Sequence, residues 1–292
     1  MLDRTIMQPK DGSDCLENVT QGLIIERGRA DAHYWRDLWR YRELFGVLAW
    51  RDLTIRYKET AFGVLWALGR PFLTMLALST VFGKLAKLPS DGNVPYPLMV
   101  LAGMLVWSFF SAGLTDAANS IIKDSGLITK VYFPRMIVPA ASVVVAFVDF
   151  LISLATLAIL MIWYQFVPSW QILLLPFFIV LACLASLGPG LWVTALNIKY
   201  RDFRFVVPFI VQFGLYISPV GFSSNIVPDK WRFIFSLNPI VGIIDGFRWS
   251  ILGGQGGIYL PGVFWSVTAT AVVLWFGIRQ FRKVERRLAD LM

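Results

Sequence analysis

Side chains that could do chemistry are few in this sequence, and their spacing does not group them into a catalytic set. His33 is the one histidine of the chain, and no Cys, Asp or Glu cluster stands around it at metal-ligand spacing. Cys15 falls in a polar region and Cys183 in an apolar one, which disfavours a disulfide between them. The sequence contains no G-x-x-x-x-G-K-[ST], G-x-S-x-G or H-E-x-x-H pattern. We therefore expect no metal site, no bound cofactor and no catalytic residue in this chain.

Three ionisable residues stand within or beside long apolar runs: Arg70, Asp116 and Asp149. A charge at the centre of a bilayer costs roughly 2.5–3.5 kcal/mol, so each of them needs a partner or water. Asp149 is either part of a polar path or gate, or one half of an ion pair between helices with Arg70 as the candidate partner. We favour the ion pair, because a proton relay would show more groups of this kind.

The composition places these residues in a membrane. Of 292 residues, 57% are hydrophobic and only 16% are charged, and the mean hydropathy is +0.62. A soluble domain carries about 25% charged residues. The net charge of +8 comes from short basic segments between apolar runs, as in the cytoplasmic loops of membrane proteins. This distribution argues against nucleic-acid binding.

The sequence predicts an all-α polytopic membrane protein with six transmembrane helices. About 20 apolar residues are needed to cross the hydrocarbon core as a helix, and prolines inside such helices are expected to kink them. The predicted spans are 62–83, 98–121, 136–166, 170–196, 205–227 and 259–278.

Residues 231–254 are apolar but are interrupted by polar residues and glycines, so they could be a seventh crossing or a re-entrant segment. A seventh crossing would put the basic C-terminal cluster on the outer side, against the positive-inside tendency. The sequence therefore predicts outer re-entrant helices before the last span. The cluster consists of Arg279, Arg282, Lys283, Arg286 and Arg287.

This re-entrant segment is either a gate or a rigid packing element, and the sequence leaves both open. Asn238-Pro239 and nearby glycines would let the backbone turn inside the protein. Asp245 and Arg248 are three residues apart, so they could pair on one helical face.

Four regions follow from this pattern: a cytoplasmic N-terminal tail (1–33), an amphipathic helix (34–61), a transmembrane domain (62–279) and a cytoplasmic C-terminal tail (280–292). In 34–61, one helical face would carry Leu38, Tyr41, Phe45 and Leu48. This helix is expected in the cytoplasmic headgroup layer, or packed on another subunit.

Several short motifs resemble the ABC-2 type transporter permease family, in particular its branch that exports O-antigen and related polysaccharides. Each motif alone is weak, but their order and the lengths of the spans agree with the family over roughly residues 40–280. The motifs are Trp50-Arg51-Asp52-Leu53-Thr54-Ile55-Arg56-Tyr57-Lys58, Gly63-Val64-Leu65-Trp66, Arg70-Pro71, Lys130-Val131-Tyr132-Phe133-Pro134-Arg135, Lys199-Tyr200-Arg201-Asp202-Phe203-Arg204, Ser218-Pro219-Val220 and Leu237-Asn238-Pro239-Ile240.

The resemblance implies a homodimer in the bacterial inner membrane. The positive-inside tendency of the basic segments predicts that both termini are cytoplasmic. It further implies two separate ATP-hydrolysing subunits, which would use the ATP and Mg. Residues of the amphipathic helix and of the loop 123–135 would receive their motion, although that loop could also be a solvated connector. The residues expected at this interface are Trp50, Arg51, Asp52, Arg56, Lys123, Leu127, Lys130 and Arg135.

The implied cargo is a lipid-linked polysaccharide, and a second set of residues could line its canal or gate. Aromatic faces can pack on the C–H faces of sugar rings, although aromatic residues also form ordinary interfacial belts. The candidates are Trp66, Arg70, Trp107, Phe110, Asp149, Tyr216, Asn238 and Pro239.

A basic rim of Arg51, Arg56, Lys58, Lys123, Lys130 and Arg135 could attract a pyrophosphate-linked carrier or anionic membrane lipid. Three alternatives stay open for the function. One is an ABC-2 permease for teichoic acid, a drug or a peptide. The others are a transporter driven by ion gradients and a membrane enzyme of glycan assembly.

Overall fold

The computed structural model describes residues 34–58, 63–131, 133–200, 202–253 and 257–290. Throughout these ranges the regular structure is helical, without a β-strand. The chain divides into two compact units, Met1–Arg40 and Tyr41–Met292. The described helix of the first unit is α2 (Tyr34–Arg40), and all the other helices belong to the second.

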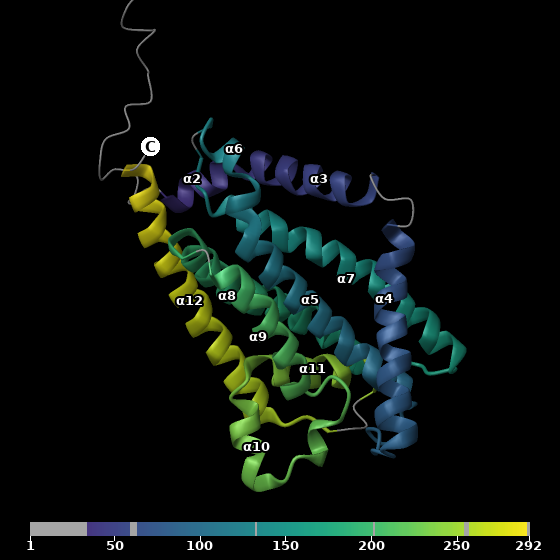
Figure 1. Ribbon diagram of the computed structural model, residues 1–292. Coiled ribbons are helices and arrows are strands. Elements are labelled where there is room, and N and C mark those ends of the chain that lie inside the picture. The colour runs from purple at the N-terminus through teal and green to yellow at the C-terminus, as the bar shows by residue number, and fades with distance from the viewer. Residues whose placement is uncertain (1–33, 59–62, 132, 201, 254–256, 291–292) are drawn as a thin grey trace, which may run out of the picture. The chain divides into compact units, whose positions relative to one another are not determined.

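The second unit contains long helices joined by short ones (Figure 1). Its α-helices are α3 (Arg42–Lys58), α4 (Gly63–Leu78), α5 (Tyr96–Lys123), α6 (Ser125–Ile128), α7 (Ile137–Trp163), α8 (Leu175–Lys199), α9 (Phe203–Ile217), α10 (Asp229–Ser236), α11 (Pro239–Ile251) and α12 (Leu260–Asp290). A π-helix, η1 (Ser79–Leu85), extends α4, and two 3-10 helices are η2 (Trp170–Leu174) and η3 (Ser224–Ile226).

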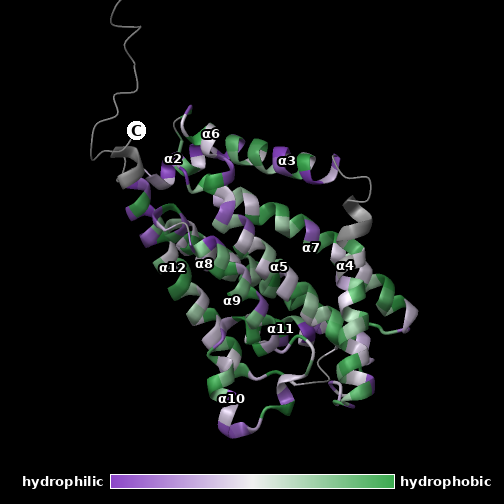
Figure 2. Ribbon diagram, in the orientation of Figure 1, coloured by the Kyte–Doolittle hydropathy of each residue, from purple (hydrophilic) through white to green (hydrophobic). Residues whose placement is uncertain are grey.

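Four of these helical segments are long and apolar enough to cross a membrane: Tyr96–Lys123, Ile137–Trp163, Trp170–Lys199 and Leu260–Arg286. They correspond to the second, third, fourth and last predicted spans, and hydrophobic residues dominate their ribbons in Figure 2. The first and fifth predicted spans coincide with shorter apolar helices, Pro71–Leu85 and Phe203–Ile217. The number of six crossings therefore stays a prediction.

The fifth predicted span, 205–227, does not form one helix. Helix α9 ends at Ile217, and Ser218 has extended backbone angles, with φ −92° and ψ 152°. Pro219 accounts for this break, because a proline disfavours helical angles in the residue before it and has no N–H to donate.

The expected single helix over 34–61 is two helices in the structure, α2 and α3. The apolar face predicted for this region is turned inward in the second unit: Leu48 is buried and Tyr41 and Phe45 are half-buried, whereas Glu43 is exposed. Trp50, which was not assigned to that face, is exposed. A position in the headgroup layer stays a prediction.

Two short helices, α10 and α11, occupy the predicted re-entrant segment, and the chain breaks between them at Asn238. The Asn238 side chain caps α11 by accepting a hydrogen bond from the Ile240 N–H at 3.2 Å, while Pro239 takes the first helical position, where its missing N–H is no loss. Helix α11 is almost wholly buried. Whether it enters a membrane stays a prediction.

Helix α5 forms the centre of the core. Its buried residues pack against α4, α7, α8, α9 and α11, and α12 lies along α8. Helices α8 and α12 approach so closely that their backbones touch at two glycines. A Cβ on Gly277 would lie 2.2 Å from the Gly188 carbonyl oxygen, and one on Gly188 would lie 2.9 Å from the Leu274 Cα. Small residues at such a crossing allow membrane helices to pack through their backbones.

A buried arginine links α11 to α5 and to the segment that follows α9. Arg248 of α11 is only 3% exposed. Its Nε, Nη1 and Nη2 donate hydrogen bonds to the carbonyls of Met99 (2.9 Å), Phe222 (3.0 Å) and Val220 (2.7 Å), respectively. Gly103 makes room for it, because a Cβ there would lie 2.4 Å from Nη2.

The predicted direct pair between Asp245 and Arg248 is wrong. Asp245 accepts a hydrogen bond from the Ser224 hydroxyl at 2.7 Å, and the guanidinium turns to backbone carbonyls instead. The two residues do share one helical face, but the guanidinium donates hydrogen bonds to the carbonyls of Met99, Phe222 and Val220, which offer it more acceptors than one carboxylate would.

The α8–α12 contact predicts a sharp difference between two glycine substitutions. We expect Gly277→Ala to lower the free energy of unfolding by about 1–3 kcal/mol, because the new methyl group must push two backbones apart. Gly69→Ala is the matched control, since no atom lies within 4 Å of a Cβ at that position. Thermal unfolding of the two purified variants in the same detergent measures this, and equal melting temperatures would contradict the close contact.

Candidate functional site

The face of α3 that packs against the long helices carries two residues of opposite charge. Asp52 and Arg56 are four residues apart, so they lie one turn apart on the same face of the helix. This face packs against α7, with α5 close enough for side-chain contact. The pattern presents one anion and one cation to two of the long apolar helices.

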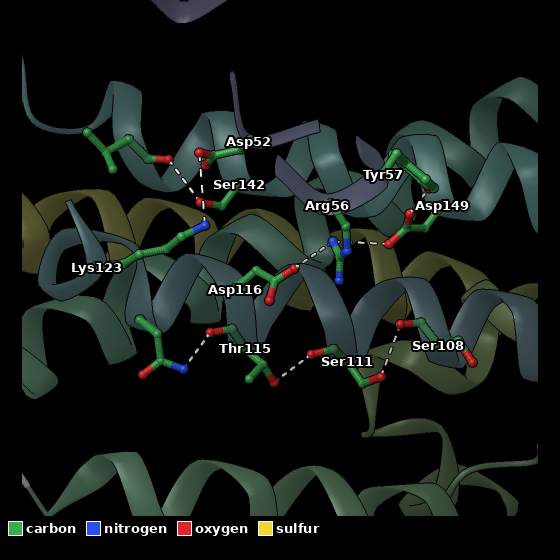
Figure 3. A network of polar contacts seen from close by, with 12 residues as sticks. Asp52, Arg56, Tyr57, Ser108, Ser111, Thr115, Asp116, Lys123, Ser142 and Asp149 are labelled. Atoms are coloured by element: carbon green, nitrogen blue, oxygen red, sulfur yellow. Dashed lines mark hydrogen bonds and ion pairs between the residues drawn. The ribbon is translucent and has the colours of Figure 1, made fainter. Parts of the chain in front are cut away.

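Arg56 bridges two carboxylates that come from different helices (Figure 3). Its Nη1 lies 3.2 Å from Asp116 Oδ2 in α5 and 3.0 Å from Asp149 Oδ2 in α7. The Tyr57 hydroxyl donates a hydrogen bond to the other oxygen of Asp149. Burial, followed by this hydrogen bond, raises the pKa of Tyr57 above its usual value, so the phenol stays protonated and keeps donating at neutral pH.

Arg51 forms a second bridge one turn and a half before the first. Its Nη2 lies 2.8 Å from Asp52 Oδ1 and 2.6 Å from Asp124 Oδ1, just after α5, and Lys123 approaches Asp52 at 3.9 Å. Burial alone would lower the pKa of Arg51, but the hydrogen bond to Asp52 and the charge of Asp124 outweigh it and raise the pKa. The two bridges hold α3 against the end of α5 and against α7.

The residues predicted at a partner interface separate into two groups. Arg51, Asp52 and Arg56 form the bridges; Asp52 is buried, and the two arginine side chains are 35% and 39% exposed. Trp50 is 73% exposed, and Lys123 and Lys130 are exposed as well.

The loop that carries the other interface residues contains the short helix α6, in which Leu127 is half-buried. After it, the Arg135 N–H donates to Glu285 Oε1 of α12 at 2.7 Å. This bond ties the end of the loop to the last helix.

Asp149 has Arg56 and Tyr57 as partners, which the sequence did not suggest. The predicted kind of contact, an ion pair between helices, is present. The proposed partner, Arg70, lies in α4 with Trp66, but their side chains fall outside the described part of the chain, so a pairing with Arg70 stays a prediction.

The other predicted canal residues differ in their surroundings. Trp107 is only 5% exposed and packs on Gly214 of α9, where a Cβ would lie 2.6 Å from its Cη2. Its ring centroid lies 5.5 Å from that of Phe110. Tyr216, in contrast, is 66% exposed. Trp107 is thus a packing residue within one chain, and Tyr216 is available for contacts outside it.

A polar stripe that the sequence analysis did not identify runs along α5. Ser111, Thr115 and Asn119 each donate a side-chain hydrogen bond to a carbonyl one turn earlier, at 3.1, 2.7 and 3.0 Å. Figure 3 shows that Ser108, Ser111 and Thr115 follow one another along the helix beside Asp116. Their spacing of three and four residues was visible in the sequence and puts them on one face. Each side-chain oxygen can still accept a further hydrogen bond.

Comparison with known proteins gives the class to which these apolar helices belong, a membrane transport permease component. The family model described as ABC-2 type transporter matches residues 43–252, more than half of the chain. The chain belongs to the ABC-2 type transporter family.

Three relatives show which members of this family the chain is similar to. The O-antigen export system permease protein RfbA of Klebsiella pneumoniae is 25% identical over 256 residues, covering 86% of this chain and 95% of that protein. The protein of the same name from Myxococcus xanthus is 27% identical over 216 residues, 73% of this chain and 82% of the relative. The inner membrane transport permease YadH of Escherichia coli K12 is 24% identical over 201 residues, 63% of this chain and 74% of the relative.

The Arg56 bridge predicts a measurable charge imbalance. We expect Arg56→Gln to lower the free energy of unfolding by roughly 1–2 kcal/mol and to speed hydrogen exchange in α3, because it leaves two carboxylates facing each other without a cation. Hydrogen–deuterium exchange of the detergent-solubilised protein measures the second effect.

The control for this substitution is Lys58→Gln, which removes an exposed positive charge from the same helix. Adding Asp116→Asn and Asp149→Asn to Arg56→Gln should restore part of the loss, since it removes the repelling charges. If Lys58→Gln and Arg56→Gln behave alike, the bridge does not hold α3.

Proposed function

We propose that this chain is the permease subunit of an ATP-driven exporter that moves a lipid-linked polysaccharide, O-antigen or a similar glycan, outward across the bacterial inner membrane. The observation that carries the proposal is the similarity to O-antigen export permeases over 86% of this chain and 95% of the relative. Similarity over almost the whole length of the relative covers the canal-forming helices as well as the motifs of the N-terminal part.

Two copies of the chain form the exporter, together with two ATPase subunits that use ATP and Mg. This chain has no phosphate-binding glycine loop of its own. The exposed residues Trp50, Lys123 and Lys130 offer a docking surface, and the bridges of Arg51 and Arg56 lie directly behind it. Movement of α3 by an ATPase would thus act on α5 and α7 through ion pairs.

The exposed face of α9 supports a canal between two copies. Phe205, Phe209, Phe213 and Tyr216 are all more than half exposed, and the rings of Phe209 and Phe213 lie 4.5 Å apart. A row of aromatic faces can pack on sugar C–H groups without fixed hydrogen bonds, so a polymer could slide past it. The polar stripe of α5 would accept hydrogen bonds from sugar hydroxyls.

The membrane orientation follows from the basic segments. Lys123, Lys130, Lys199 and the basic end of α12 lie at helix ends that the positive-inside rule assigns to the cytoplasm, together with both termini. Of the six rim residues, Arg51, Arg56 and Lys123 are paired with carboxylates, which reduces the charge available for a pyrophosphate-linked carrier.

A second candidate is an ABC-2 permease for another cargo, such as teichoic acid, a drug or a peptide. The similarity to a protein named only as an inner membrane transport permease favours keeping it. An ion-coupled transporter would use Asp149 to carry its ion, whereas this carboxylate is held in place by Arg56 and Tyr57.

The cargo assignment predicts the phenotype of a gene deletion in the native host. We expect loss of surface polysaccharide together with accumulation of carrier-linked polymer inside the cell, because synthesis continues while export stops. Gel analysis of surface glycan and mass spectrometry of lipid-linked intermediates measure the two pools. Restoration by the intact gene is the control, and normal surface glycan without retained polymer would overturn the polysaccharide assignment.

The docking surface predicts that Trp50→Ala weakens assembly with the ATPase. A large exposed aromatic at a protein interface contributes about 2 kcal/mol or more, so we expect roughly 30-fold weaker association. Co-purification of tagged permease with the ATPase measures it, and Trp231→Ala, which alters an exposed tryptophan in α10, is the matched control. Equal recovery with both variants would contradict a partner interface at α3.

A further inference from the structure

A cavity of about 340 Å³ opens between the C-terminal parts of α8 and α12. It belongs neither to the charged site at α3 nor to the aromatic face of α9, and its volume falls in the range of small-molecule sites, roughly 300–1,000 Å³. The residues that matter for its chemistry are Trp192, Leu196, Lys199, Tyr200, Gln280 and Lys283.

The chemistry of the cavity changes along the helices. Trp192, Leu196 and Lys199 follow one another on one face of α8, from an indole and an aliphatic side chain to an ammonium group two turns further on. On α12, Gln280 precedes Lys283. One end of the cavity is therefore apolar and the other is cationic, which suits an amphipathic ligand with an anionic head.

The positive charge of this cavity is not balanced by neighbouring acids. Within the described part of the chain, its lining includes no Asp or Glu, and neither Lys199 nor Lys283 has a carboxylate within 4.0 Å. Glu285, the nearest acid along α12, already accepts the Arg135 N–H at 2.7 Å. The contrast with the α3 site is clear, because there Arg51 and Arg56 are paired with aspartates.

Two further features bear on anion binding. The Lys199 ammonium lies 4.7 Å from the centroid of the Tyr200 ring, which steadies the side chain without neutralising it. The carbonyl end of α8 opposes an anion with about half a negative charge, but two ammonium groups exceed that charge. The balance at the cavity mouth is therefore positive.

We infer that this cavity binds the headgroup of an anionic phospholipid. Lys199 and Lys283 contact the phosphate, Gln280 donates a hydrogen bond to a headgroup oxygen, and the first carbons of the lipid lie against Trp192 and Leu196. A free phosphate would use the two lysines but would leave the apolar wall uncovered, so a lipid fits the whole surface better. Tryptophan and lysine together are typical of the membrane interface. This site does not depend on which cargo the protein exports.

The test uses native mass spectrometry to measure the binding of phosphatidylglycerol to the purified full-length chain in detergent. We expect Lys199→Gln/Lys283→Gln to weaken phosphatidylglycerol binding by about tenfold, because each lysine near a lipid surface contributes appreciably to attraction of an anionic headgroup. Phosphatidylcholine with the same acyl chains should bind weakly and equally to both proteins. Both lysines are exposed, so the double variant should keep the melting temperature of the parent.

The matched control is Lys84→Gln/Lys230→Gln, which removes two exposed lysines far from the cavity in sequence. Equal loss of binding in the two double variants, or in neither, would overturn the site. A further arm uses Trp192→Leu, which should weaken the lipid and leave binding of inorganic phosphate unchanged. If inorganic phosphate binds the parent as tightly as phosphatidylglycerol does, the lipid assignment is wrong.

Discussion

The structure depends most on the requirement that backbone carbonyls find donors where water is scarce. Helix α9 ends at Ile217, two residues before Pro219, and the chain that follows is irregular, so its carbonyls have no helical partners. Arg248 supplies the donors for Val220 and Phe222, and it also reaches Met99 in α5. An unsatisfied polar group in an apolar medium costs several kcal/mol. One buried guanidinium thereby joins α5, α11 and the segment after α9. The missing Cβ of Gly103 leaves room for it.

The charges at α3 follow a different rule, because they are only partly buried. The Arg56 side chain is 39% exposed, and its two carboxylate partners are 37% and 24% exposed. Such pairs contribute about 0–1 kcal/mol each, far less than a buried contact of the kind that Arg248 makes. The α3 bridges are therefore strong enough to set the position of the helix and weak enough to rearrange. This is the behaviour that a helix receiving motion from a partner would need.

The distribution of paired and unpaired cations separates two cationic regions that look alike in sequence. The basic residues around α3 and α6 lie close to Asp52, Asp116, Asp124 and Asp149, so much of their charge is used inside the protein. Lys199 and Lys283 lie beside aromatic and aliphatic side chains instead. A phosphate group is therefore attracted more strongly to the C-terminal ends of α8 and α12 than to the region around α3 and α6, although the second region has more basic residues.

The sequence by itself determined that the chain lies in a membrane, where its long helices are, and which family it resembles. Runs of about 20 apolar residues have few alternatives to a membrane helix, and the α10–α11 break follows from the local chemistry of Asn238 and Pro239. The order of short motifs was enough for the resemblance that the family match confirmed. Contacts between helices were decided by the tertiary structure alone. Tyr57 meets Asp149 across 92 positions, and Arg248 meets Met99 across 149, because such partners depend on how α3 packs on α7 and how α11 packs on α5. Local periodicity states which face a side chain occupies, and only packing decides what lies opposite that face.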